Sequence, residues 1–290
     1  MRRLIAAALV LAACAPRPDA EPEAATTTAA ATVAPNVVHI KTTDFAFDAP
    51  DTIPAGLTTF HLMNEGPDWH HASLIRIEEG HTMDEAMEAF AAQEAPASDH
   101  AQEAPAWIHA VGGPNAPFAG GTSEVTLDLE AGNYVLVCFV PGPDEVPHVA
   151  KGMVRPLTVV PSDAPTGPLP EADLAVTMTD YDWTMSAPIT AGKQVIRFEN
   201  TASQPHELWF AKLAPGTTAE QLMAWFQKPE GPPPFTESGG IGALEAGQVQ
   251  LMTHDFAPGD YALICWIGDA TDNRPHFMHG MMKQITVAAS

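Results

Sequence analysis

The stretch from Asn133 to Val160, NYVLVCFVPGPDEVPHVAKGMVRPLTVV, places a long loop between two β-rich runs. The stretch from Asp260 to Ala288, DYALICWIGDATDNRPHFMHGMMKQITVA, has the same layout. The flanking runs are rich in Val, Ile, Leu and Tyr and are bounded by Gly, Pro and Asp, which predicts strands. Both loops begin with a cysteine, carry a histidine and close with Gly-Met. This repetition predicts two copies of one β-rich unit.

The repeat extends over most of the chain. Three blocks align, pairing 43–90 with 179–226, 112–138 with 239–265 and 148–160 with 276–288. The sequence therefore predicts two homologous domains, each large enough to bury its own core. Their predicted limits are 37–160 and 171–290, with a Pro-rich linker at 161–170.

Short runs with strand composition recur through both copies, and one amphipathic segment in each copy breaks the pattern. TMDEAMEAFAA from Thr82 and TAEQLMAWF from Thr218 both open as capping boxes, which predicts one helix per domain. Many short strands with a single inserted helix predict an all-β fold made of two Greek-key β-sandwiches.

The same four residue types occur in both copies in the same order: histidine, cysteine, histidine and methionine. Two imidazoles, a thiolate and a weakly bound thioether are the ligand set of a blue-copper centre. The first histidine lies well upstream of the other three, so the folded sandwich must bring the set together. The predicted metal ligands are His70, Cys138, His148 and Met153 in the first copy and His206, Cys265, His276 and Met281 in the second.

Two alternatives concern the cysteines and a neighbouring histidine. Cys138 and Cys265 could be buried as small hydrophobic side chains with no metal. A disulfide between them is disfavoured, because they occupy equivalent positions of separate domains. His71 adjoins His70, but the alignment pairs His70 with His206 and His71 with Glu207. His70 is therefore the predicted ligand.

The N-terminus has the composition of a targeting segment. Residues 1–13 combine two arginines with a short apolar run, and Leu11-Ala-Ala-Cys14 resembles the lipobox of bacterial lipoproteins. That resemblance implies lipidation of Cys14 and an exported, membrane-anchored lipoprotein facing the periplasm or the cell exterior. Residues 14–36 are expected to form a disordered acidic tether. The alternative is an ordinary secretory signal with an incidental cysteine.

The formal net charge of −23 restricts the partners of the protein. Phosphate groups repel such a surface, so nucleic acid is excluded as a partner. The charge favours either a basic partner or simple solubility. For a redox protein, the expected partner is a basic electron-transfer protein such as a c-type cytochrome.

Each domain resembles the cupredoxins, the family of plastocyanins, azurins and the domains of multicopper oxidases and nitrite reductases. NTASQPHELWF, from Asn200, resembles the plastocyanin segment with an Asn shortly before a Pro-His ligand pair. CFVPGPDEVPHVAKGM, from Cys138, resembles the type 1 copper loop of copper nitrite reductases. The loops differ from those of small carriers, because nine and ten residues separate cysteine from histidine. The resemblance implies tandem cupredoxin-like sandwiches that bind copper and transfer electrons.

The sequence predicts that the protein is not an enzyme. Copper oxidases and nitrite reductases place histidines of a second copper centre beside the blue-site cysteine. Here the neighbours of the cysteines are Val137 and Phe139, then Ile264 and Trp266, and no His-x-His pair occurs in the chain. Two alternatives remain open beside electron transfer: a copper storage or delivery lipoprotein, and a cupredoxin-like structural module without metal.

Overall fold

The computed structural model describes residues 34–93, 104–163 and 168–289, which belong to one compact unit. The predicted signal peptide, the lipidation site Cys14 and nearly all of the tether lie outside these residues. No helix within the described ranges is long and apolar enough to cross a membrane.

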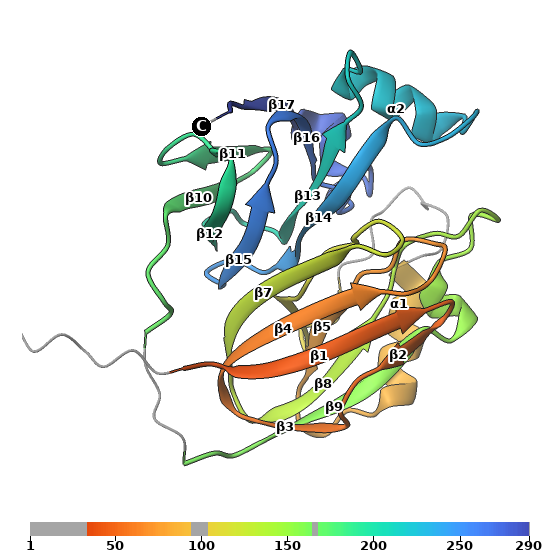
Figure 1. Cartoon of the computed structure of the whole chain (residues 1–290). Helices are drawn as coiled ribbons and strands as arrows, with labels where there is room; N and C mark the ends of the chain where they lie inside the picture. The colour runs from red at the N-terminus through yellow and green to blue at the C-terminus, as the bar shows by residue number, and fades with distance from the viewer. Residues whose placement is uncertain (1–33, 94–103, 164–167, 290) are drawn as a thin grey trace, which may run out of the picture. The chain divides into compact units, whose positions relative to one another are not determined.

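The first repeat consists of two facing groups of strands (Figure 1). One group contains β2 (Ala46–Asp48), β1 (Asn36–Thr43), β4 (Gly56–Asn64) and β7 (Thr122–Leu129). The other contains β6 (Ile108–Gly112), β5 (Ser73–Ile77), β8 (Gly132–Val137), β9 (Val154–Val160) and β3 (Thr52–Pro54). The pairs β1–β4 and β3–β9 are parallel, and the others are antiparallel.

The second repeat has nearly the same arrangement. One group contains β11 (Asp182–Met185), β10 (Leu174–Thr179), β12 (Gly192–Asn200) and β15 (Val249–Phe256). The other contains β14 (Phe235–Leu244), β13 (His206–Leu213), β16 (Gly259–Ile264) and β17 (Met282–Val287). The pair β10–β12 is parallel, like β1–β4 in the first repeat.

Alternating burial places the core between the two groups of strands. Along β1, Val38, Ile40 and Thr42 are buried while the residues between them are exposed. This two-residue period turns one face of the strand toward the opposite sheet. Phe60 on β4 and Trp183 on β11 are among the large side chains that fill the two cores.

The predicted all-β fold of two tandem β-sandwiches, each with one inserted helix, is confirmed. The helices are α1 (Met83–Gln93) and α2 (Ala219–Gln227). Both begin as predicted: the Glu85 backbone N–H donates to the Thr82 hydroxyl, and Thr218 and Gln221 form a capping box. Strands β2 and β3 have three residues each, too few to give a periodic pattern.

The sheets continue from one repeat into the other. Strand β7 pairs with β15, and β6 pairs with β14 through Val111 and Leu244, so one sheet has eight strands and the other nine. Each pairing covers a strand edge that would otherwise present unpaired N–H and C=O groups. Separating the repeats would therefore expose strand edges in both.

Candidate metal centres

The predicted ligands lie at the ends of strands and in the loops between them. His70 precedes β5, Cys138 directly follows β8, His148 begins the short 3-10 helix η1 (His148–Lys151), and Met153 directly precedes β9. In the second repeat, His206 begins β13, Cys265 follows β16, His276 begins η2 (His276–His279), and Met281 precedes β17. The last three ligands of each set therefore belong to the loop between the final two strands, as predicted.

The structure brings His70, Cys138 and His148 together in the first repeat. The Nδ1 atoms of the two histidines are 3.0 Å apart, and the Cys138 Sγ is 3.5 Å from the His148 Nδ1. All three side chains are fully buried. These donor atoms converge although His70 is far from the other two residues in the sequence.

The second repeat has the same arrangement. The Cys265 Sγ is 3.4 Å from the His276 Nδ1 and 3.9 Å from the His206 Nδ1. These three side chains are also fully buried. Both Cys138 and Cys265 are free thiols, as predicted.

The donor distances fit a single metal ion in each repeat. Nitrogen and sulfur ligands lie about 2.0 to 2.3 Å from a metal such as zinc, so two donors on one ion are at most about 4.6 Å apart. The separations between these donor atoms, 3.0 Å to 3.9 Å, fall inside this limit. A thiolate with two imidazoles suits copper or zinc and disfavours magnesium or calcium.

The backbone holds both methionines next to the other predicted ligands in each loop. The Cys138 N–H donates to the Met153 carbonyl at 3.2 Å, and the Met153 N–H donates to the His148 carbonyl at 2.9 Å. The corresponding bonds of Met281 measure 3.2 Å and 3.0 Å. Met153 and Met281 are both fully buried. Their role as axial ligands stays a prediction.

A carboxylate orients the first histidine of each set. The His70 Nε2 is 2.8 Å from Asp44 Oδ1, and the His206 Nε2 is 2.9 Å from Asp180 Oδ1. An imidazole that donates its Nε2 proton to a carboxylate keeps the Nδ1 lone pair free for a metal. The repeat alignment already paired Asp44 with Asp180, but that pairing alone did not reveal their contact with the histidines.

An asparagine fixes the loop before the first histidine in each repeat. In the first, the buried Asn64 amide donates to the Asp68 and Pro117 carbonyls at 2.7 Å and 3.2 Å. Its oxygen accepts from the Gly66 N–H at 3.0 Å. Asn200 makes the same three kinds of bond in the second repeat. These bonds satisfy turn groups that would otherwise be buried without partners.

Burial keeps the second histidines neutral. Burial, together with a smaller effect of the neighbouring His70 and His206, lowers the pKa of His148 and of His276 to about 4. Burial also raises the pKa of the Cys138 thiol to about 12. A metal that binds here meets neutral imidazoles and displaces the thiol proton.

Asp269, Asp272 and His279 form a third group of close donor atoms beside the second site. Although burial acts in the opposite direction, hydrogen bonds from Thr271, Tyr181 and Gln204 hold the pKa of Asp269 well below its usual range. Its carboxylate oxygens thus already accept several hydrogen bonds from the protein. These hydrogen bonds give the group a structural role in stabilising the loop.

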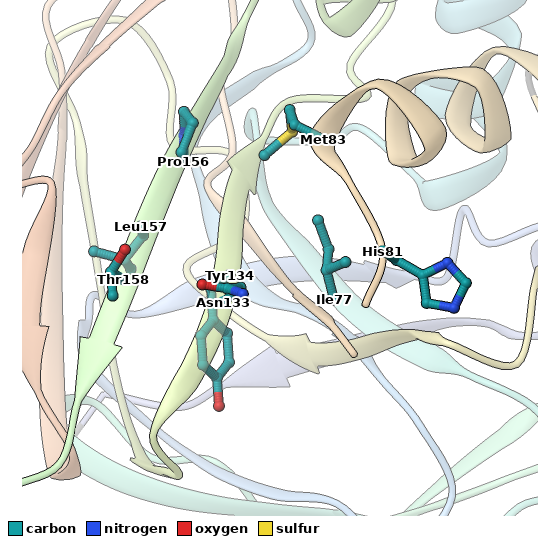
Figure 2. A pocket seen from close by; sticks show the side chains of 8 residues that line it. All are labelled: Ile77, His81, Met83, Asn133, Tyr134, Pro156, Leu157 and Thr158. Carbon is teal, nitrogen blue, oxygen red and sulfur yellow. The ribbon is translucent and has the colours of Figure 1, made fainter. Parts of the chain in front are cut away.

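A pocket of about 180 Å³ lies where helix α1 begins, beside β8 and β9 (Figure 2). None of its lining residues is a predicted metal ligand. They are Ile77, His81, Met83, Asn133, Tyr134, Pro156, Leu157 and Thr158.

Comparison with solved structures finds similar copper proteins. Auracyanin from the photosynthetic bacterium Roseiflexus castenholzii is 22% identical over 45% of this chain and 100% of its own, with a TM-score of 0.32. Auracyanin A of Chloroflexus aurantiacus, described as a "blue" copper protein, is 22% identical over 44% of this chain and 100% of its own, with a TM-score of 0.30.

Enzymes are also among the similar structures. A copper-containing nitrite reductase from Thermus scotoductus is 11% identical over 88% of this chain and 61% of its own, with a TM-score of 0.25. No protein-family model matches the chain, and no curated protein matches it significantly.

Proposed function

We propose that the protein binds one copper ion in each repeat and transfers electrons. The observation that carries the proposal is the convergence of a thiol and two imidazole Nδ1 atoms at two equivalent, fully buried positions. His70, Cys138 and His148 would hold the first ion, with Met153 as axial ligand. His206, Cys265, His276 and Met281 would hold the second.

The chain's own contribution is to hold the ligands in place. Asp44 and Asp180 fix the ring orientation of the first histidines, and burial excludes water from the donor atoms. Copper held by these residues would supply a Cu(I)/Cu(II) couple, whose potential the axial ligand and the surrounding hydrogen bonds would adjust. A site whose ligands move little between the two states suits an electron carrier.

The test is copper analysis combined with the visible spectrum of the oxidised protein. We expect about two copper ions per chain and an intense thiolate-to-Cu(II) band, as at other His₂Cys sites. Tight Cu(I) binding without colour would favour copper storage or delivery, and no binding would favour a structural module. Turnover of oxygen or nitrite by the copper-loaded protein would contradict the prediction from the sequence that the protein is not an enzyme.

We further propose that the protein is a lipoprotein whose Cys14 is acylated. In the native host, Cys14→Ser is expected to abolish lipid labelling and to release the protein from the membrane fraction, because acyl chains supply about 0.8 kcal/mol per buried methylene. Mass spectrometry of the mature N-terminus makes the test independent of fractionation. An unmodified N-terminus beyond residue 14 would contradict it.

The redox partner is proposed to be a basic protein, because the chain carries a net charge of −23. Its association rate should fall as ionic strength rises.

A further inference from the structure

The residue after the first histidine ligand occupies an equivalent place in both repeats. The His71 Nε2 accepts a hydrogen bond from the Phe139 N–H at 2.7 Å. The Glu207 Oε1 accepts one from the Trp266 N–H at 3.0 Å. Phe139 and Trp266 directly follow the two cysteines. Each side chain therefore connects the histidine segment of its site to the cysteine segment.

Asn115 joins these two side chains across the repeats. Its amide nitrogen donates to the Glu207 Oε2 and to the Ile241 carbonyl, both at 3.0 Å. With both amide hydrogens used, its oxygen accepts the Ala116 N–H at 2.8 Å, and the Asn115 side chain interacts with the His71 ring. The backbone joins the same two segments, because the Ala72 N–H donates to the Pro114 carbonyl at 3.0 Å. Because the His71 Nε2 accepts a hydrogen bond from Phe139, the neutral ring carries its hydrogen on Nδ1. This tautomer lets the ring act as a donor toward Asn115.

The three bridging side chains are shielded from solvent. His71 is 8% exposed, Asn115 3% and Glu207 5%. Hydrogen bonds in such low-dielectric surroundings are stronger than in water and make the network rigid. The result is an unbroken sequence of covalent and hydrogen bonds from Cys138 to Cys265. It runs through Phe139, His71, Asn115, Glu207 and Trp266.

We propose that the His71–Asn115–Glu207 bridge is the route by which electrons pass between the two metal centres. The inference rests on the proposed function. One centre is oxidised by one electron and the other is reduced by the same electron, so no external oxidant or reductant is consumed. No proton has to leave the bridge, because each hydrogen stays between its donor and acceptor.

A second set of contacts offers the competing route. Trp69 precedes His70, and its ring centroid is 5.8 Å from that of Phe226. The ring centroids of Phe226 and Trp266 are 5.0 Å apart. An electron on this second route would pass between aromatic rings that are not hydrogen-bonded to one another. On the first route it would pass along hydrogen bonds. Variants at Asn115 and Phe226 therefore separate the two routes.

The experiment uses the full chain loaded with copper. The Met281→Gln variant serves as background, because a changed axial ligand shifts one potential and separates the two centres. A pulse-generated one-electron reductant reduces part of the protein, and the visible bands report electron redistribution within the chain. Asn115→Leu is expected to slow this redistribution, because it removes the hydrogen bonds to Glu207 and to the Ile241 carbonyl. Copper content and both bands should stay unchanged.

Three further variants keep the test decisive. The glutamine in His71→Gln can accept a hydrogen bond from Phe139 and donate one to Asn115. Electron redistribution in this variant should therefore be as fast as in the Met281→Gln background, whereas redistribution in His71→Leu should be slower. Gln250→Leu is the matched control: it removes two buried bonds to Gly113 between the repeats, outside the bridge. Amide exchange of Phe139 and Trp266 in metal-free protein checks independently that the Leu variants open the bridge.

Unchanged redistribution in Asn115→Leu and His71→Leu would overturn the inference, as would a slow rate confined to Phe226→Leu. Both results leave the proposed function intact, because the unmodified protein would still hold two coloured centres. A protein that binds no copper would remove the proposed function and this inference together.

Discussion

Replacing one cysteine is expected to remove one copper centre and leave the other. Cys138→Ser should bind about one copper per chain and lose the visible band of the first repeat, because a hydroxyl does not replace a thiolate as a soft ligand. Cys265→Ser should lose the band of the second repeat. The double variant should bind no copper at either site. Copper per chain and the visible spectrum measure the outcome.

Full-length point variants are preferable to isolated repeats. The pairs β7–β15 and β6–β14 would be broken by separation, and the exposed edges would favour aggregation. Cys14→Ser is the matched control, since it removes the third cysteine of the chain without touching either site. If Cys138→Ser lost both coppers while its thermal unfolding stayed unchanged, the two-site assignment would be wrong.

Removing the carboxylate behind a histidine is expected to weaken the corresponding site alone. Asp44→Ala should lower copper affinity in the first repeat about 10- to 100-fold, the usual cost of losing such an orienting partner. Asp180→Ala should have the same effect in the second repeat. Asp44→Asn keeps an acceptor without the charge and should fall between Asp44→Ala and the unmodified protein. Competition with a Cu(I) chelator measures each affinity.

The control for this prediction lies in the same segment. Asp48 is exposed on β2, so Asp48→Ala removes a carboxylate of equal charge away from the histidine. Close packing around Asp44 and His70 also makes the first site sensitive to replacement of Asp44. A Cβ on Gly66 would lie 2.8 Å from Asp44 Oδ1 and 2.9 Å from His70 Nε2, so the loop covers this pair closely. Equal affinities for Asp44→Ala and Asp48→Ala would show that Asp44 does not orient the ligand.

Local pattern determined much of this protein. The repeat, the strand composition and the two capping boxes predicted tandem β-sandwiches with helices near Met83 and Ala219, as found. The recurring His, Cys, His and Met predicted which side chains converge in each repeat, and the structure brings each His–Cys–His set together. The type and order of these residues were enough for the prediction, because cysteines and histidines are scarce in the chain. Their recurrence in the same order in both repeats made the pattern recognisable.

Tertiary structure decided the surroundings of the sites. Asp44 reaches His70 because β1 pairs in parallel with β4, which brings the segments after both strands to the same end of the sheet. Asn115 meets Glu207 because the segment after β6 continues a sheet into the other repeat. Aspartate, asparagine and glutamate are ordinary surface residues in a sequence. Only the strand registers, set by burial of one face of every strand, place them against the ligands.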